Sequence, residues 1–315
     1  MKYRRLGRTR LKVSEIGFGC WAIGGTSYGP TNDDDSMAAL ETGWQSGINF
    51  FDTADTYGHG HSEELLGKFL EHKNRSEIFI ASKVGWDFYH GGSKKNFDPE
   101  YIRFACDQSL NRLKTDYVDL YQLHNPSLEK IKSGEAVAIL DGLKKKGKIR
   151  FIGISIHQEA EAFAAMEDPR VDVLQAPFNL IDQRMAENVF REAKLKQIGI
   201  LAREPLACGL LTGKYNADHQ FDKTDHRRRW TKEKLAVDME KIQTLKKILA
   251  TERLSLVQAA LEFVLDFDAV GCVIPGAKTR EQVLENIRAS KDPKLRSEES
   301  YDLRQLYLRE EIFKK

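Results

Sequence analysis

The chain has 315 residues, 41% of them apolar, and a formal net charge of +2. This is enough apolar material for a sizeable core, and the near-balance of charge gives no electrostatic case for binding nucleic acid or an anionic membrane. No apolar run approaches the roughly 20 residues of a membrane helix, and the basic start lacks the apolar segment of a secretion signal.

The four cysteines are scattered and form no C-x-x-C pair, which favours reduced thiols. We therefore expect a cytoplasmic protein with neither a disulfide framework nor a zinc site. His59, His61 and Glu63 resemble a group of metal ligands, but they begin a helix after a loop and lack a further convincing ligand. We therefore expect no bound metal.

Short apolar strands alternate with amphipathic helices along most of the chain, as in sheets whose strands are parallel and buried on both faces. The strands are expected at Glu15–Cys20, Ile48–Asp52, Ile78–Val84, Val118–His124, Arg150–Ser155, Val171–Phe178, Gly199–Arg203 and Ala269–Pro275. Eight such units predict a closed barrel or a doubly wound sheet. Because no linker interrupts the pattern, we expect a single domain over residues 1–315.

Glycines near the end of the first strand, in the stretch GFGCWA at residues 17–22, fit a dinucleotide-binding fingerprint. That fingerprint requires a helix to open at its third position. Here Gly24, Gly25 and Pro30 follow, and they predict a loop. We therefore interpret the match as accidental.

Polar residues lie where the second, third and fourth strands end. Asp52 closes the second strand, with Tyr57 shortly after it, Lys83 lies near the end of the third, and His124 closes the fourth. Taken singly, each has an ordinary explanation as a turn, cap or core residue. Consecutive strand ends of a barrel are neighbours on one rim, where active sites are built. We therefore expect these four side chains to converge.

These four side chains suit carbonyl reduction. Hydride that reaches a carbonyl carbon leaves negative charge on oxygen, so a proton donor must lie beside that oxygen. The phenol of Tyr57 has an ordinary pKa of about 10, and a nearby ammonium such as that of Lys83 favours its ionised form. Asp52 would hold Lys83 in place, and His124 would hydrogen-bond the substrate oxygen.

The expected helices carry ordinary end signals, such as Asp98 before one helix and Gly147 after a lysine run that ends another. The long polar stretch at residues 214–234 is interpreted as a solvated loop. The alternative is a flap whose arginines at 227–229 approach a phosphate.

The segment VIPGAKTREQVLEN, residues 273–286, predicts a strand that runs into a helix start. Thr279 and Gln282 have the spacing of a capping box. Free backbone N–H groups and the helix dipole favour a phosphate at such a start, and Lys278 adds a full positive charge. The alternative is an ordinary capped surface helix.

Three segments, FFDTADTYG, SKVG and YQLH, resemble the aldo-keto reductase superfamily in order and spacing, and the similarity extends over nearly the whole chain. The resemblance implies an α/β fold, a (β/α)8 TIM barrel of parallel strands with its active site at the C-terminal rim. It implies an NADP(H)-dependent oxidoreductase acting on an aldehyde, ketone or sugar carbonyl. It also implies a catalytic tetrad of Asp52, Tyr57, Lys83 and His124, with Tyr57 as general acid and base.

The resemblance also implies the cofactor site. It brings Gly276, Lys278 and Gln282 to the 2′-phosphate and Glu285 and Asn286 to the adenine, and a cation at Lys278 favours NADP(H) over NAD(H). The full set of expected cofactor contacts is Gly19, Cys20, Trp21, Asp52, Ser155, Gln175, Arg203, Leu206, Gly209, Leu211, Gly276, Lys278, Gln282, Glu285 and Asn286. The expected substrate pocket comprises Trp21, Tyr57, Trp86 and His124.

Two positions depart from the family pattern beside Ser155 and Gln175, the residues implied at the nicotinamide. The family commonly has asparagine after that serine, where this chain has Ile156. Many members stack a tyrosine on the nicotinamide, where this chain has Arg203, whose planar guanidinium can also stack. A cation there would disfavour NADP⁺ relative to NADPH, so we expect a lean towards reduction.

Two other functions remain open. One is the same chemistry in the oxidative direction, an NAD(P)-dependent dehydrogenase of a sugar hemiacetal. The other is a cofactor-sensing regulatory subunit with little turnover. Whether the enzyme works as a reductase or as a dehydrogenase, its expected partner is a small carbonyl or sugar substrate. No nucleic acid and no membrane is expected as a partner.

Overall fold

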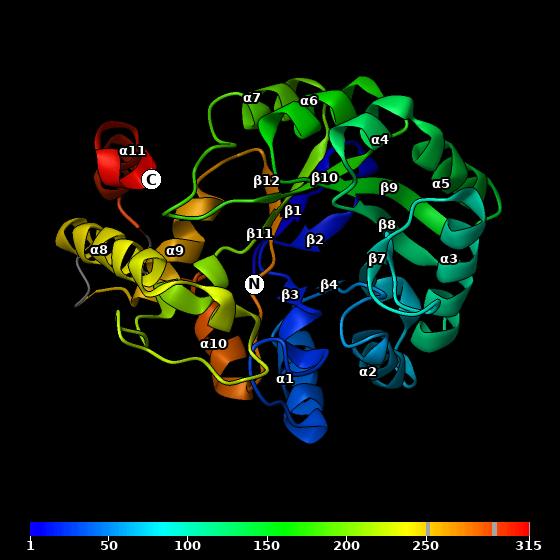
Figure 1. Ribbon diagram of the computed structural model, residues 1–315, viewed down its shortest axis with the longest axis horizontal. Coiled ribbons are helices and arrows are strands. Elements are labelled where there is room, and N and C mark those ends of the chain that lie inside the picture. Colours follow the sequence, from blue (N-terminus) through cyan, green and yellow to red (C-terminus); the bar gives the residue numbers. More distant parts are fainter. Residues whose placement is uncertain (250–252, 292–294, 315) are drawn as a thin grey trace.

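The computed structural model describes residues 1–249, 253–291 and 295–314, and these contain an eight-stranded parallel sheet that curls around a centre (Figure 1). Each strand of this sheet pairs with the next one along the chain. The strands are β3 (Phe18–Gly19), β4 (Phe50–Asp52), β5 (Phe79–Val84), β8 (Val118–His124), β9 (Ile149–Ser155), β10 (Val173–Pro177), β11 (Gly199–Arg203) and β12 (Val270–Val273). Parallel bridges join Ile16 to Val273 and Gly19 to Gly276. These bridges link the two edge strands, so the expected (β/α)8 barrel is confirmed.

Helices surround the strands on the outside (Figure 1). They are α1 (Asp33–Gln45), α2 (His61–Leu70), α3 (Pro99–Leu113), α4 (Leu128–Ser133), α5 (Glu135–Lys145), α6 (Glu159–Glu167), α7 (Val189–Leu195), α8 (Lys232–Ile248), α9 (Leu256–Leu265), α10 (Arg280–Arg288) and α11 (Ser297–Arg309). Short 3₁₀ helices cover Gly7–Thr9, Cys20–Ile23, Arg75–Glu77, Ala207–Thr212, His226–Arg229 and Glu311–Lys314. Within the described residues, no helix is both long and apolar enough to cross a bilayer.

A hairpin closes the N-terminal end of the barrel. It pairs β1 (Tyr3–Arg5) with β2 (Lys12–Ser14), and Leu6 follows β1 with 0% exposure. Leu6 packs on the backbone of Gly199 and Gly271, because a Cβ atom at either glycine would lie 2.8 Å from its Cδ1. The hairpin therefore fills this end with apolar atoms.

Alternation along the strands separates an apolar layer from a polar one inside the barrel, because side chains two residues apart share one face. The apolar layer next to the hairpin includes Phe50, Ala81, Leu120, Val173 and Leu201. The residues two positions further along the same strands are Asp52, Lys83, Gln122, Gln175 and Arg203. The polar layer therefore lies at the C-terminal ends of the strands.

Two local expectations need correction. The first strand is shorter than Glu15–Cys20, because Ile16 makes a single bridge and Cys20 begins a 3₁₀ helix. That short helix is followed by irregular chain up to α1, so the glycine fingerprint opens no α-helix. The capping box at α10 is incomplete, because Gln282 Oε1 accepts from the N–H of Lys278 (2.8 Å) and not from that of Thr279.

Candidate active site

A cavity of about 1030 Å³ opens at the C-terminal ends of the strands and extends to α10. The sequence-predicted residues that line it are Gly19, Trp21, Asp52, Tyr57, Trp86, His124, Ser155, Gln175, Arg203, Leu206, Gly209, Gly276, Lys278, Gln282, Glu285 and Asn286. A pocket of this size at the C-terminal face is the usual location of a ligand site in this fold.

Two residues expected at the cofactor have side chains elsewhere. Cys20 and Leu211 both have 0% exposure and pack in the hydrophobic core. The Cys20 thiol turns inward at the start of its 3₁₀ helix, with Sγ 3.7 Å from the carbonyl oxygen of Phe18. Leu211 turns inward near the end of another 3₁₀ helix, whose apolar face contacts α9. The side chains of Cys20 and Leu211 therefore form no part of the cavity wall.

Lys83 holds together the buried half of the site. Its side chain is 1% exposed, and Nζ donates to Asp52 Oδ1 (2.6 Å), to the carbonyl oxygen of Thr53 (2.8 Å) and to Tyr57 Oη (3.0 Å). An ammonium has three N–H donors, so all three are in use. The tyrosine, lysine and aspartate predicted to converge do meet.

The second oxygen of Asp52 is held by two amides. Oδ2 accepts from Gln175 Nε2 (2.7 Å) and from Gln122 Nε2 (3.2 Å). A buried ion pair needs such extra hydrogen bonds to offset its desolvation. Gln122 is absent from the sequence-predicted site, although it lies two residues before His124 on the same face of β8.

Burial and charge oppose each other at Tyr57. Burial raises the pKa of the phenol above its ordinary value, and the ammonium of Lys83 opposes that rise without cancelling it. Only the effect of the Lys83 ammonium on the pKa of Tyr57 was expected from the sequence. Burial also acts to lower the pKa of Lys83, but Asp52 and Tyr57 outweigh it and the pKa is raised. At neutral pH the phenol is therefore protonated and the ammonium is charged.

His124 faces Tyr57 as a neutral imidazole. The two rings are 6.0 Å apart and nearly perpendicular, and Nδ1 of His124 has no hydrogen-bond partner within the described residues. Burial first, and then cations including Lys83 and Lys95, hold the pKa of His124 well below its ordinary value. Lys95, in the rim hairpin of β6 (Trp86–Asp87) and β7 (Lys94–Lys95), donates to the His124 carbonyl oxygen (2.6 Å). Its Nζ also lies 4.3 Å from the centre of the Trp86 ring.

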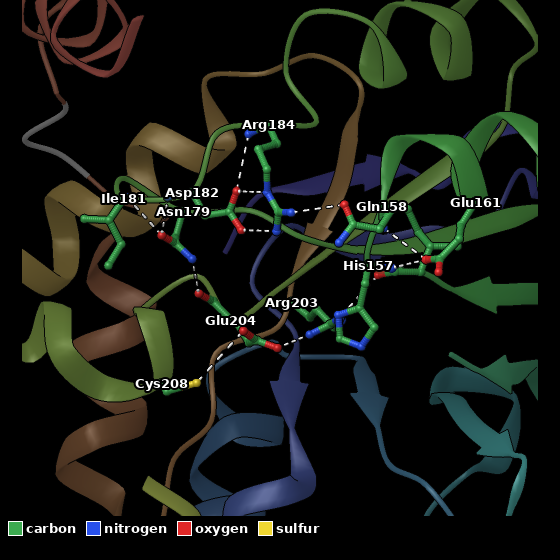
Figure 2. A network of polar contacts seen from close by, with 11 residues as sticks. His157, Gln158, Glu161, Asn179, Ile181, Asp182, Arg184, Arg203, Glu204 and Cys208 are labelled. Atoms are coloured by element: carbon green, nitrogen blue, oxygen red, sulfur yellow. Dashed lines mark hydrogen bonds and ion pairs between the residues drawn. The ribbon is translucent and has the colours of Figure 1, made fainter. Parts of the chain in front are cut away.

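Arg203 is tied into a polar network at the end of β11 (Figure 2). Its guanidinium donates to Glu204, to His157 Nδ1 (2.8 Å) and to the carbonyl oxygen of Ile156 (3.2 Å). The carbonyl oxygen of Glu204 accepts from Asn179 (3.0 Å). Ile156 has 0% exposure and faces the core. The two departures from the family pattern are therefore linked, and Glu204 offsets the charge of Arg203.

At the far end of the cavity, Lys278 bridges two segments. Its Nζ donates to the carbonyl oxygens of Tyr28 (2.6 Å), Gly29 (3.0 Å) and Pro30 (3.2 Å), in the loop before α1. The start of α10 and this loop are thereby joined beside the cavity. The ammonium of Lys278 is engaged by backbone, a contact that the sequence did not indicate.

The polar stretch at 214–234 also packs against this end. The N–H of His226 donates to the carbonyl oxygen of Ser27 (2.9 Å), and the His226 ring lies 4.8 Å from that of Trp21. Arg227 is 5% exposed and pairs with Asp225 (2.6 Å), and both Arg227 and Arg229 line the cavity. The expected solvated loop is therefore wrong for residues 225–227, which cover the cavity.

Groups suited to hold a nicotinamide dinucleotide lie along the length of the cavity. Near the polar layer, Ser155 Oγ donates to Asn125 Oδ1 (2.7 Å), and both residues line the wall. Further along, Ala207, Cys208 and Gly209 have φ values of 47°, 54° and 91°. Successive backbone N–H groups in turns of this kind form anion sites, as does a helix N-terminus such as that of α10. Asn125 directly follows His124, the last residue of β8, and this position at a strand end is the signal that could have indicated Asn125 as a site residue.

The chain matches the model of the Aldo/keto reductase family over residues 15–307. It is 32% identical to the uncharacterized oxidoreductase YqkF of Bacillus subtilis strain 168, with 100% of this chain and 99% of that protein covered. It is 30% identical to the NADH-specific methylglyoxal reductase of Escherichia coli strain K12, with 92% and 93% covered. The structure of the glycerol dehydrogenase AKR11B4 from Gluconobacter oxydans superimposes with a TM-score of 0.83, at 29% identity and with 98% and 95% covered.

Proposed function

Because this chain belongs to the aldo/keto reductase family, we propose that it transfers hydride between NADP(H) and the carbonyl of an aldehyde, ketone or sugar. The observation that carries the proposal is the contact of 3.0 Å between the buried Lys83 Nζ and the Oη of Tyr57, which lines the cavity. A phenol beside a fixed ammonium is a proton donor and acceptor suited to a carbonyl oxygen.

The residues of the chain divide the work around that oxygen. The bound cofactor supplies or accepts the hydride. In reduction, Tyr57 donates its proton to the oxygen, and Lys83 stabilises the phenolate that remains. Asp52 fixes Lys83, and the neutral imidazole of His124 donates a hydrogen bond to the substrate oxygen. The rings of Trp21 and Trp86 form apolar walls of the substrate pocket.

A preference for NADP(H) over NAD(H) is supported by charge at the adenosine end. Lys278 lies immediately before the N-terminus of α10, where the helix dipole and free N–H groups attract a phosphate. To bind a 2′-phosphate, the ammonium of Lys278 must give up at least one of its hydrogen bonds to the carbonyl oxygens of residues 28–30 and donate to the phosphate instead. The name of the Escherichia coli relative specifies NADH, so dissociation constants for NADPH and NADH measured side by side test the preference of this chain.

Oxidation of an alcohol or sugar hemiacetal is a second candidate, and the Arg203–Glu204 ion pair removes the electrostatic argument against it. A lone cation at the nicotinamide would oppose the oxidised cofactor, but here the carboxylate of Glu204 offsets that charge. The solved glycerol dehydrogenase, a structural neighbour, is named for the oxidative reaction. Steady-state rates with NADPH plus aldehydes, and with NADP⁺ plus aldoses and polyols, will separate the two directions.

Replacing Tyr57 tests the proposal directly. We expect Tyr57→Phe to lower kcat by about 10²–10⁴-fold, the usual contribution of a general acid, while NADPH binds with nearly unchanged affinity. NADPH absorbance measures turnover, and quenching of protein fluorescence measures binding. The matched control is Tyr117→Phe, which removes the hydroxyl of a tyrosine just before β8, at the end of the barrel away from the cavity. Unchanged turnover in Tyr57→Phe would remove Tyr57 from its role, and a wild type without turnover on any carbonyl would favour a regulatory subunit.

A further inference from the structure

A second group of buried ionisable side chains lies behind the turn that carries Tyr57. Glu63 on α2 has 0% exposure, and its Oε2 accepts from Arg112 Nε on α3 (2.8 Å), with Arg112 Nη2 at 2.7 Å. Its Oε1 accepts from the hydroxyl of Ser82 on β5 (2.5 Å). Glu63 is therefore the carboxylate that neutralises Arg112.

Asp55 is a second carboxyl in this group, and its surroundings are different. Its exposure is 0%, and within the described residues neither of its oxygens accepts a well-formed hydrogen bond, so the N–H of Thr56 supports the carboxyl only weakly. The ammonium of Lys83 has already committed its three N–H donors, and Arg112 is engaged by Glu63. A charged carboxylate without donors is strongly disfavoured in a protein interior.

The charges around Asp55 agree with its geometry. Burial first, and then the negative charge of Glu63, raise the pKa of Asp55 well above its ordinary value, while Arg112, the backbone N–H of Thr56 and Lys83 oppose the rise. The other titratable groups that interact with Asp55 are the phenols of Tyr89, Tyr101 and Tyr121. The pKa of each phenol is itself raised by burial, so none of them supplies a charge at neutral pH.

Backbone hydrogen bonds hold one end of the turn from residue 53 to residue 60, and the side chain of Arg112 packs against the other end. The N–H of Asp55 donates to the carbonyl oxygen of Lys83 (3.3 Å), and the N–H of Tyr57 donates to that of Ala54 (3.1 Å). At the other end, the side chain of Arg112 lies against Gly60, where a Cβ atom would come within 2.7 Å of Arg112 Cδ. A change in this group would therefore reach Tyr57 through the backbone of a short turn.

We propose that Asp55 is a positioning residue for Tyr57, and that it acts as an un-ionised carboxylic acid packed beside the Glu63–Arg112 ion pair. This inference rests on the proposed function, since it assigns a support to the phenol that transfers the proton. An un-ionised Asp55 adds no negative charge behind Lys83, so Asp52 is the carboxylate that pairs with its ammonium. It also avoids a buried charge beneath the turn, where its oxygens have no well-placed donor.

Infrared spectroscopy tests the protonation state without reference to turnover. At pH 7 the wild type should show the carbonyl-stretch band of an un-ionised carboxylic acid, and Asp55→Asn should lose it. The matched control is Asp119→Asn, which removes a carboxylate with 0% exposure that pairs with Arg75 (2.7 Å) and Arg150 (2.8 Å) and should remove no such band. A wild type without the band, or an Asp55→Asn variant that keeps it, would overturn the inference.

Kinetics test the positioning role. Asp55→Asn keeps the shape and neutrality of the acid and should retain kcat, whereas Asp55→Ala should lower kcat by about tenfold or more, because small misplacements of a reacting group are costly. The NADPH dissociation constant should stay the same in both, and the alkaline limb of the kcat profile should move only in the alanine variant.

Two kinetic results would contradict that role: full turnover in Asp55→Ala, or equal losses in the alanine and asparagine variants. Should the alanine variant fail to fold, Asp55→Ser replaces it in the comparison. An inactive wild type that shows the infrared band would count against the proposed function and leave the state of Asp55 established.

Discussion

At the scale of single residues, the Asp52–Lys83 pair links stability to chemistry. Lys83→Met leaves the carboxylate of Asp52 buried without its cation, which should cost about 3–5 kcal/mol of unfolding free energy. Adding Asp52→Asn removes that charge and should recover much of the loss. Turnover should stay low in both variants, because without Lys83 the largest opposition to the effect of burial on the pKa of Tyr57 is lost. Urea unfolding and NADPH oxidation measure the two properties.

The control for this pair is an exposed one. Lys194 and Asp268 form an ion pair with side chains 64% and 82% exposed, and Lys194→Met should change stability by only about 0.2–1 kcal/mol. If the double variant were no more stable than Lys83→Met alone, the charge of Asp52 would not be the source of the instability.

The polar layer also shows how far residues can be predicted from sequence. Asp52, Lys83 and His124 could be predicted because strand ends share a rim, and the same alternation could have added Gln122. The pairing of Arg203 with Glu204 could not be predicted, because neighbours along a strand normally face opposite ways. Glu204 has a φ of 57°, which ends the strand and turns its side chain back.

At the scale of elements, the strands and helices were predictable and the segments over the cavity were not. Apolar runs and helix-end signals located β5, β8 and α3, because period and capping are local properties. The 225–227 segment reads as polar loop, yet it is anchored by Ser27, about 200 residues earlier in the chain. Such long-range contacts leave no periodic signal in the sequence.

Lys278 joins two of these elements, which makes its role testable. If it contacts the 2′-phosphate, Lys278→Met should raise the NADPH dissociation constant by about tenfold or more, as expected for a lost charged hydrogen bond. The constant for NADH should change little. Lys214→Met, at another lysine of the cavity wall, is the control, and fluorescence titration is the measurement. Equal weakening of both cofactors would mean that Lys278 acts only by holding the 28–30 loop.

At the scale of the whole molecule, the two ends of the barrel are separated by the apolar layer. The hairpin and Leu6 close one end, and the polar layer and cavity occupy the other. In this fold the C-terminal face carries the chemistry and the opposite face contributes stability. Substitutions at the hairpin should therefore change unfolding without changing catalysis.

Leu6→Ala tests this separation. Leu6 has 0% exposure and packs on β11 and β12, so its truncation should lower the unfolding free energy by about 2–5 kcal/mol, the range for a buried leucine. Well below its melting temperature, the variant should keep the kcat and the NADPH affinity of the wild type, measured by absorbance and fluorescence. Leu195→Ala, at a leucine 73% exposed, should alter stability by no more than about 0.5 kcal/mol. A folded Leu6→Ala protein with much reduced kcat would show instead that packing at the closed end controls the polar layer.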